Sequence, residues 1–463
     1  MSARERVHRR NLVLLWAGQF TNTAGLMMLV PIMPFYVRDM GVRGTAEIQA
    51  WAGVAIAAPA LVLTVATPLW GRLGDRVGRH WMVVRALAGL AASMLVMAVA
   101  TNPLTLVAGR LLQGGLGGVV EAAQAFAGAA APGGRRGSAL GKSFSATAAG
   151  SLAGPVLGGA LVGAGQLAVL MVVIAVVAAL LAGACALGLR DPRTAPPEPT
   201  ARPGPAARQD RSRRAGFWRV PGALPLAAAA VAAYLGVYGL IPVFAEHVQQ
   251  GFPSGRAGLW VGIFQSLTWG ATLVASFWWG RHNDRAQRPV RTLAVATTVC
   301  AASITAQALP LGVAGLVVLR AAQGIGFAAL AQSLFFHFGG HALEEQRSGY
   351  VGTANSFLLV GQSAGPLLAG PLALVLPTPA SIVLLGAACG VAGACCACAA
   401  RSERARGSAA ERSADRGTDA PVLRRMSGNL DPPSEESGAG PAPRSAAERL
   451  SQHSGTGGQR PSR

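Results

Sequence analysis

The chain has 463 residues, of which 51% are hydrophobic and only 13% are charged, and its formal net charge is +20. A soluble protein carries about twice that charged fraction, so the composition excludes an ordinary water-soluble globular protein. Apolar runs without charge recur along the chain, and about 20 such residues cross a bilayer as a helix. The sequence therefore predicts an all-α membrane protein with twelve transmembrane helices. The predicted spans are residues 12–36, 47–70, 81–101, 104–130, 139–163, 166–189, 221–245, 257–280, 291–310, 312–336, 348–375 and 378–400.

Four short motifs occur twice, in the same order and 209 to 211 residues apart. Residues 71–76 (GRLGDR) return as 280–285 (GRHNDR), and residues 110–114 (RLLQG) return as 320–324 (RAAQG). The other pairs are 150–155 with 361–366 and 30–32 with 241–243. This duplication predicts two pseudo-symmetric six-helix bundles. The expected divisions are a first bundle over 1–189, a cytoplasmic linker over 190–217, a second bundle over 218–400 and a disordered cytoplasmic tail over 401–463.

Basic residues concentrate in alternate connections between the spans. Arginines precede the first span and follow the second, fourth, sixth and eighth, whereas the loops at 101–103 and 163–166 carry none. The positive-inside rule then places both termini in the cytoplasm of a plasma-membrane protein. Only Arg38, Arg43 and Arg256 interrupt the pattern. The positive charge therefore indicates topology and contact with the lipid bilayer, and nucleic acid is not an expected partner.

The repeated motifs resemble those of a transporter family. The stretch from Gly71 to His80 is similar to the signature loop of the major facilitator superfamily, and Arg110-x-x-Gln113-Gly114 is similar to its second motif. The fifth span carries Gly150-x-x-x-Gly154-Pro155-x-x-Gly158-Gly159, which resembles a motif of the family's proton-coupled exporters. Pro31-Ile32-Met33-Pro34 resembles a motif of the twelve-span drug:proton antiporters. The resemblance covers roughly residues 10–400 and implies the major facilitator fold.

The signature loop is expected to act as a conformational latch. The resemblance implies that Asp75 sits at the positive N-terminal end of the eleventh span, near residues 347–352, and holds the cytoplasmic side shut. The alternative is a solvated turn, which Gly-Asp and Gly-Arg pairs form readily. The candidate latch residues are Gly71, Asp75, Arg76, Gly78, Arg79, Asp284 and Arg285.

In the fifth span, Gly150, Gly154 and Gly158 repeat every four residues and so share one helix face, on which another helix can approach closely. Pro155 lacks a backbone donor and can bend the span. The expected role of this motif, which also includes Gly159, is a tight contact between the halves that limits leak. The alternative is small-residue packing without a coupling role.

The fourth span carries the candidates for coupling. At the helical period of about 3.6 residues per turn, Arg110 and Glu121 share a polar face with Gln124, as a cavity-lining side would. An ionisable residue within a span is a functional candidate by default. Arg110, Gln113 and Glu121 are therefore candidates for proton and substrate coupling, with Glu121 as the proton carrier. The alternative for Glu121 is a structural charge near the cytoplasmic interface.

Amide and aromatic side chains in other spans are candidates for lining a central cavity. Such a mixture suits an amphiphilic organic ligand, although each residue could instead serve packing or anchoring at the interface. Glu246 and His247 are expected to form a solvated outer end, and His337 is a weaker candidate for proton relay. The cavity candidates are Gln19, Asn22, Gln124, Tyr234, Tyr238, Gln265, Trp269, Asn355 and Gln362.

Together these features favour a proton-coupled exporter of small amphiphilic organic molecules, such as drugs, secondary metabolites or siderophores, that works by alternating access. No Walker loop, metal-ligand spacing or nucleophile elbow occurs, so neither an enzyme nor a metal site is predicted. The proton gradient is the expected energy source, with no cofactor, and a monomer is expected. The alternatives are an importer of a sugar, organic acid or peptide, and a non-transporting membrane sensor.

Overall fold

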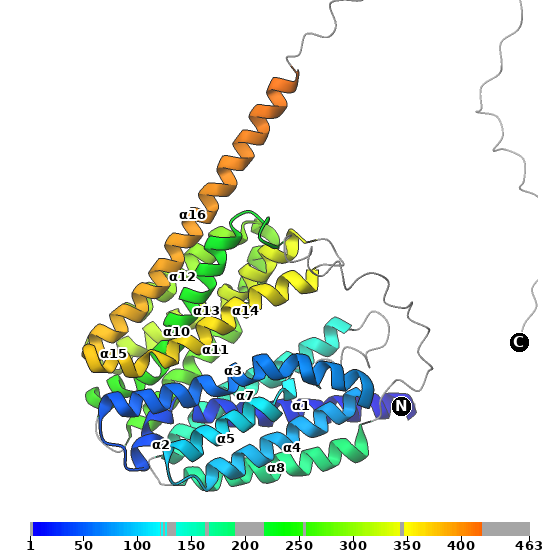
Figure 1. Cartoon of the computed structure of the whole chain (residues 1–463), viewed down its shortest axis with the longest axis vertical. Coiled ribbons are helices and arrows are strands. Elements are labelled where there is room, and N and C mark those ends of the chain that lie inside the picture. Colours follow the sequence, from blue (N-terminus) through cyan, green and yellow to red (C-terminus); the bar gives the residue numbers. More distant parts are fainter. Residues whose placement is uncertain are drawn as a thin grey trace, which may run out of the picture. The chain divides into compact units, whose positions relative to one another are not determined.

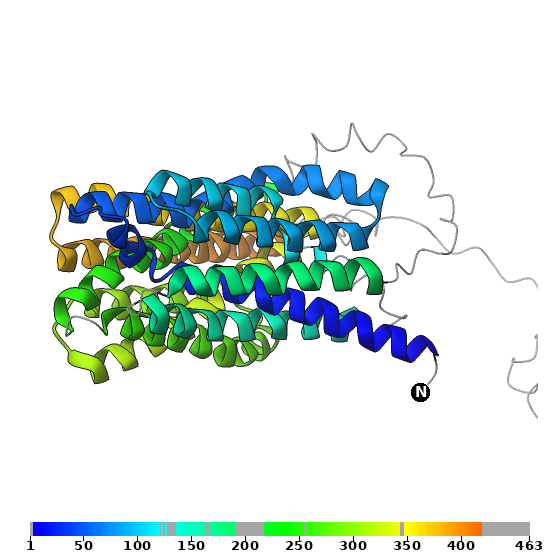
Figure 2. The same ribbon diagram turned by 90° about the horizontal axis from the view of Figure 1, so that it is seen from below.

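A computed structural model describes residues 3–120, 122–123, 126, 136–162, 166–189, 217–252, 256–342 and 347–418. The chain divides into a compact unit that ends at Gly407 and a second unit, Ser408–Arg463. The compact unit contains the helices that correspond to the twelve predicted spans, and they run lengthwise beside one another (Figure 1, Figure 2). Apart from turns and connections, the described residues form helices. This is expected because backbone N–H and C=O groups within lipid must be hydrogen-bonded inside the protein.

The helices of the first half follow the predicted spans, except that a short helix is added and the fourth span is interrupted after Leu116. A short helix, α2, follows α1 because Pro31 lies in the turn after Leu29 and Pro34 lies in the first turn of α2, where a missing N–H is tolerated. The bounds are α1 Ala3–Leu29, α2 Met33–Asp39, α3 Thr45–Val77, α4 Arg79–Ala98, α5 Pro103–Leu116, α7 Arg136–Val162 and α8 Leu167–Gly188.

The helices of the second half repeat this order. In place of the break after α1, Pro242 stays inside the long helix α10, where no second proline follows it within a turn. The eleventh predicted span is bent by 41° at Leu368, between α14 and α15. The bounds are α10 Ala223–Gly251, α11 Ala257–Ala286, α12 Pro289–Ala306, α13 Gly312–Gly340, α14 Arg347–Leu367, α15 Ala369–Val375 and α16 Thr378–Thr418.

The helix contacts of one half are repeated in the other. In the first half α1 packs on α7, and α5 packs on α3 and α4. In the second half α10 packs on α14, and α13 packs on α11 and α12. The halves meet where α7 packs on α11 and where α3 packs on α14 and α15. The arrangement is that of two pseudo-symmetric six-helix bundles.

The outer surface of the bundles is apolar. Within the described residues, nine helices are long and apolar enough to cross a membrane, or ten if the bent pair α14–α15 is one span. In α8, whose sequence is almost entirely Ala, Val and Leu, the side chains of Val169, Val173 and Leu180 are exposed. A row of exposed branched apolar side chains on a helix of this length fits contact with lipid.

Candidate functional site

Arg110 lies inside the first bundle with no contact to solvent. Its side chain is 0% exposed on α5, and Nε donates to the backbone oxygen of Ala55 on α3 at 2.8 Å. Nη1 donates to Oε1 of Gln113, one turn along the same helix, at 2.7 Å. The spacing of three residues in the motif therefore brings an amide oxygen to the guanidinium.

Arg320 occupies the matching place on α13 in the second bundle and is 1% exposed. Nη1 donates to Oε1 of Gln323 at 3.1 Å, and Nη2 donates to Oε1 of Gln265 on α11 at 2.7 Å. The guanidinium carbon lies 4.1 Å from the centre of the Phe244 ring, a cation–π contact. Among the described residues, no acidic side chain forms an ion pair with Arg110 or Arg320.

An aromatic cluster lies beside Arg320. Tyr234 and Tyr238, one turn apart on α10, stack with ring centroids 5.5 Å apart, and Phe327 of α13 lies 5.4 Å and 6.0 Å from them. Trp269 of α11 is 5.8 Å from Phe327. Tyr238, Trp269, Gln265, Gln323 and Arg320 line one cavity, whose space open to a water-sized group is about 20 Å³. Four of the predicted cavity residues, Tyr234, Tyr238, Gln265 and Trp269, are therefore brought together.

The fourth predicted span is not one regular helix. The prediction that Arg110 and Glu121 share a helix face assumed an unbroken helix, and this assumption is wrong. Helix α5 ends at Leu116, and Gly118 has a positive φ of 90° before helical residues resume at Val119. Four glycines at 114, 115, 117 and 118 make a continuous helix costly. The freed carbonyl of Gly117 accepts from Arg85 Nη2 at 2.7 Å. Glu121 and Gln124 lie outside the described residues.

The motif of the fifth span contacts two different helices. Gly150, Gly154 and Gly158 lie against the backbone of α1, within the same half, where an added Cβ would clash. This close approach was predicted, but the expected contact between halves is made elsewhere on α7. Gly159 lies against the backbone oxygen of Gly258, and the backbone oxygen of Pro155 lies against Gly262, both on α11.

The second copy of this motif makes equivalent contacts, one set within the second half and one set with the first half. Gly361 and Gly365 of α14 lie against the backbone of α10. The backbone oxygen of Pro366 lies against Gly53 of α3, and Gly370 of α15 lies against Ala50. The two halves are thus joined along two seams, α7–α11 and α14/α15–α3, in which glycine faces backbone. Within the described residues, one polar contact crosses the first seam, from Ser266 Oγ to the backbone oxygen of Leu152 at 2.7 Å.

An ion pair joins the halves near the ends of α2 and α10. Arg38 Nη2 donates to Glu246 Oε2 at 2.9 Å, and Nη1 donates to Gln249. The prediction that Glu246 forms a solvated end is therefore wrong, because its side chain is only 8% exposed. Gln250 donates to the other Glu246 oxygen at 3.2 Å and to Thr378 at 3.3 Å. This network also explains why Arg38 interrupts the charge pattern.

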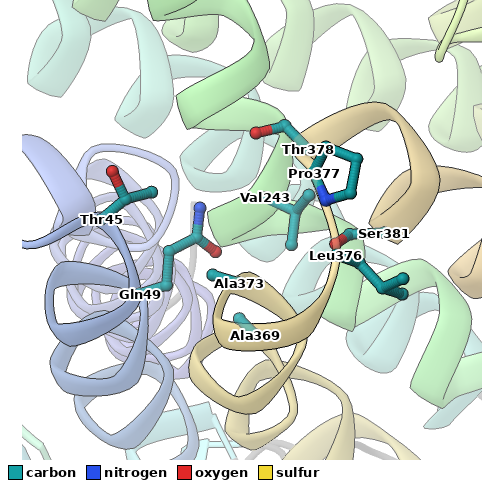
Figure 3. A pocket seen from close by; sticks show the side chains of 9 residues that line it. All are labelled: Thr45, Gln49, Val243, Ala369, Ala373, Leu376, Pro377, Thr378 and Ser381. Carbon is teal, nitrogen blue, oxygen red and sulfur yellow. The ribbon is translucent and has the colours of Figure 1, made fainter.

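A second cavity of about 120 Å³ lies at the α3 seam. Thr45 and Gln49 come from α3, and the opposite wall is Val243 with the turn between α15 and α16 (Figure 3). Gln49 is buried and points into this space, and its Oε1 has no hydrogen-bond partner among the residues that the structure describes. The two halves therefore meet here around a small polar gap.

The two halves separate along the α14/α15–α3 seam at the end that is farther from α15. Gly349 and Gly352, near the start of α14, have open space around them, and Asn355 and Ser356 are exposed. The ribbons of α3 and α14 also diverge toward this end (Figure 1). The contacts between α3 and α14 therefore concentrate near α15.

The signature motif forms the last two turns of α3 rather than a loop. Helix α3 continues to Val77, and only Gly78, with φ of 109°, separates it from α4. In the second copy Gln287, with φ of 49°, takes the place of Gly78, and each donates its N–H to the carbonyl four residues before it at 3.1 Å. The side chains of Gly71, Asp75, Arg79 and Arg347 lie outside the described residues, while Arg76, Asp284 and Arg285 are exposed. The latch stays a prediction.

Other predicted cavity residues are not gathered around Arg320. Gln19 is buried in α1 and donates to the backbone oxygen of Leu15 at 3.2 Å, and Asn22 is half-buried. Gln362 is half-buried on α14. His337 is buried at the end of α13 with Nε2 3.2 Å from the backbone oxygen of Pro221.

The candidate set missed Arg320, Gln323 and Phe327, although the repeat at 320–324 pointed to the first two. It also missed a repeated tryptophan. Trp70 Nε1 donates to the backbone oxygen of Gly115 at 2.7 Å, and Trp279 Nε1 donates to that of Ile325 at 2.8 Å. Each tryptophan directly precedes a copy of the signature motif, so extending that repeat by one residue would have found both.

The sequence profile of the Major Facilitator Superfamily matches residues 15–311 and 268–446. The chain belongs to this superfamily. Its helices, duplicated motifs and two bundles are those of a multi-pass membrane protein with the major facilitator fold, and the family consists of transporters, not enzymes.

Two relatives within the superfamily are named transport or resistance proteins. The chain is 34% identical over 382 residues to the staphyloferrin B transporter of Staphylococcus aureus (strain NCTC 8325 / PS 47), a match that covers 82% of this chain and 90% of the relative. It is 35% identical over 141 residues to multidrug resistance protein MdtG of Proteus mirabilis (strain HI4320), covering 30% of this chain and 35% of that relative.

Solved structures agree on the fold. A bacterial homolog of the human lysosomal transporter Spinster, in an inward-facing and unoccupied conformation, superposes with a TM-score of 0.69 at 14% identity, covering 87% of this chain and 98% of that one. A point mutant of the nucleoside transporter NupG superposes with a TM-score of 0.64 at 13% identity, covering 84% of this chain and 99% of that one.

Proposed function

We propose that this superfamily member is a proton-coupled exporter of small amphiphilic organic molecules, such as drugs, secondary metabolites or siderophores. It would work by alternating access, taking its energy from the proton gradient and no cofactor, as a monomer in the plasma membrane with both termini in the cytoplasm. The relatives named for staphyloferrin B transport and multidrug resistance support this substrate range.

The observation that carries the proposal is the position of the 150–159 motif. This motif resembles that of the family's exporters, and its Pro155 and Gly159 lie at the seam between the halves. A contact there can change only when the halves move relative to each other, so the motif is suitably placed to govern alternation. With the predicted topology, the halves touch on the outer side and part on the cytoplasmic side, which would admit a substrate from the cell interior.

Coupling requires a group that binds a proton in one state more tightly than in the other. The proposed carrier is Glu121, an ionisable residue within the fourth predicted span, and Arg110 and Gln113 are proposed to contribute to coupling. Asp75, with Gly71, Arg76, Gly78 and Arg79 and the second copy at Asp284 and Arg285, is proposed to hold the cytoplasmic side shut after the halves have moved.

The test is dye transport in inverted vesicles with an imposed pH gradient, acid inside. Export appears as accumulation of the cationic dye ethidium or the anionic dye fluorescein inside the vesicles, and it should stop when the gradient is collapsed. Glu121→Gln should lose dependence on the gradient, while Glu47→Gln, which changes an exposed carboxylate in the first turn of α3, should behave as wild type.

Three outcomes contradict parts of the proposal. Full gradient dependence in Glu121→Gln would reject that carrier. Accumulation only in right-side-out vesicles would make the protein an importer. An absence of both transport and counterflow in either orientation would favour a sensor. For the latch, Asp75→Asn should shift the inward and outward populations in distance measurements between labels on α3 and α14.

A further inference from the structure

We propose that the cavity beside Arg320 is a subsite for a carboxylate group of the transported molecule. The inference rests on the proposed transport function and deepens it, because it assigns a chemical feature to the substrate. The site is formed by Arg320 and Trp269 as donors, Gln265 and Gln323 as supports of the guanidinium, and the rings of Tyr238 and Phe327 as the apolar wall.

No described residue balances the charge of Arg320. The contacts to its guanidinium are the two amide oxygens and the Phe244 ring, which offer partial charges only. None of the described acidic residues pairs with it. A buried cation without an anionic partner is costly within a membrane-spanning bundle, and such residues generally mark a pathway or a ligand. A carboxylate at this place would supply the missing charge.

Two donors at the cavity have no acceptor among the described residues. They are the buried atoms Arg320 Nε and Trp269 Nε1, and both side chains line the same cavity. A buried donor left unpaired costs free energy that an acceptor recovers. One donor on each terminal nitrogen of Arg320 is already held, by Gln323 and Gln265, so the orientation of the guanidinium is fixed before a ligand arrives.

The size and walls of the cavity favour an organic carboxylate over a free inorganic anion. Its space of about 20 Å³ admits one oxygen-sized group. Tyr238 and Trp269 keep part of their surface exposed, so the apolar body that carries the carboxyl group can lie against aromatic rings while one carboxylate oxygen enters the cavity. An inorganic anion would gain the charge but not this contact.

The first half has no equivalent of this arrangement at Arg110, although its motif is the same. Arg110 Nε donates to the backbone oxygen of Ala55, whereas Arg320 Nε has no partner in the described part of the chain. The residue on α11 that corresponds to Ala55 is Gln265. Its side-chain oxygen Oε1 accepts a hydrogen bond from Nη2 of Arg320, not from Nε. Among the described residues, this change from a backbone to a side-chain acceptor leaves Arg320 Nε without an acceptor, whereas Arg110 Nε has one.

The experiment is an equilibrium titration of the full-length protein in lipid nanodiscs, with naphthoate and the uncharged isostere naphthamide as probes. Tryptophan fluorescence and the thermal unfolding midpoint report binding. Naphthoate should bind at least about tenfold more tightly than naphthamide, because hydrogen bonds to charged groups are the stronger class. Acetate and chloride should compete only weakly, since they lack the apolar body.

Variants separate the two donors. Arg320→Gln should bring naphthoate affinity down to that of naphthamide, and Trp269→Phe should weaken naphthoate binding by about threefold to tenfold without changing naphthamide binding. Arg281→Gln removes an exposed arginine of α11 and should leave both affinities unchanged. If Arg320→Gln does not fold, the Trp269→Phe comparison decides.

Equal affinity for the two probes in wild type overturns the subsite, as does a preference for naphthoate that survives in Trp269→Phe at full strength. Competition by chloride as effective as that by naphthoate would make it an inorganic anion site and also reject the proposal. The titration needs no gradient, so its failure with intact ethidium efflux rejects the subsite alone. The reverse pattern, a carboxylate preference without efflux, rejects export alone.

Discussion

Arg38 of α2 and Glu246 of α10 form an ion pair of 2.9 Å that joins the two halves of the protein. Neutralising Glu246 as Glu246→Gln removes the charge that holds Arg38 across this boundary. Because the pair is only partly exposed, we expect the closed outer contact to weaken by about 1–2 kcal/mol, which is about a 5- to 30-fold change in the ratio of the two states. Distances between spin labels on α2 and α10 should show more of the separated state.

The matched control for that prediction is the exchanged pair Arg38→Glu with Glu246→Arg, which restores attraction with reversed charges. It should recover most of the wild-type distance distribution. If Glu246→Gln alone leaves the distribution unaltered, the ion pair does not contribute to closure.

The seams between the halves predict a strong effect of single methyl groups. Gly262→Ala would place a Cβ against the carbonyl of Pro155, and Gly53→Ala would do the same against Pro366. We expect each to lower the unfolding midpoint or to separate the outer ends of the halves, at a cost of about 1–3 kcal/mol. Gly183→Ala in α8, where a Cβ would meet nothing, is the control and should be neutral or stabilising. Wild-type stability and wild-type distances in both seam variants would show that the seams accommodate an added methyl group and would contradict this prediction.

The proposed subsite predicts that a built-in carboxylate can replace the ligand. Gln265→Glu would set an anion against Arg320 Nη2, where the amide oxygen now lies at 2.7 Å. We expect an unfolding midpoint raised by on the order of 2 °C and no further stabilisation by naphthoate. Gln265→Leu, which removes the acceptor, should lower the midpoint instead. An unchanged response of Gln265→Glu to naphthoate would count against the subsite.

The junction after α3 depends on a backbone conformation that favours glycine. Gly78 has φ of 109° and ψ of 145°, a region that other residues enter only at a cost of about 1–3 kcal/mol. Gly78→Ala should therefore lower stability by that amount. Gln287→Gly, which restores glycine at the matching site with φ of 49°, should raise it by up to about 1 kcal/mol. Chemical unfolding followed by circular dichroism measures the stability of both variants. Equally small changes in the two variants would contradict the expected loss in Gly78→Ala and gain in Gln287→Gly.

Much of the fold was accessible from the sequence because the lipid environment leaves few choices. Long apolar runs predicted the spans, and the offset of the motifs predicted two bundles before any contact was known. The spacing of Gly150, Gly154 and Gly158 correctly indicated a close helix approach. Which helix approaches could not be predicted, because periodicity identifies a face but not its neighbour.

Each wrong or missed prediction has a physical cause. The helical projection of the fourth span assumed an unbroken helix, and the glycines at 117 and 118 ended it. Glu246 looked like a solvated end because its partner Arg38 lies 208 residues away in the sequence. The environment of Arg320 depends on Gln265 and Trp269 from another helix, so its unpaired donor could be seen only once the helices were packed.

The glycine-to-carbonyl seams affect the free energy that this transporter needs to move its two halves relative to each other. Interlocked side chains would have to be pulled out of one another's grooves whenever the bundles rotate. Smooth main-chain surfaces can instead roll past each other with little lost contact. The energy gap between the two states can then stay small, within reach of one bound proton or one carboxylate.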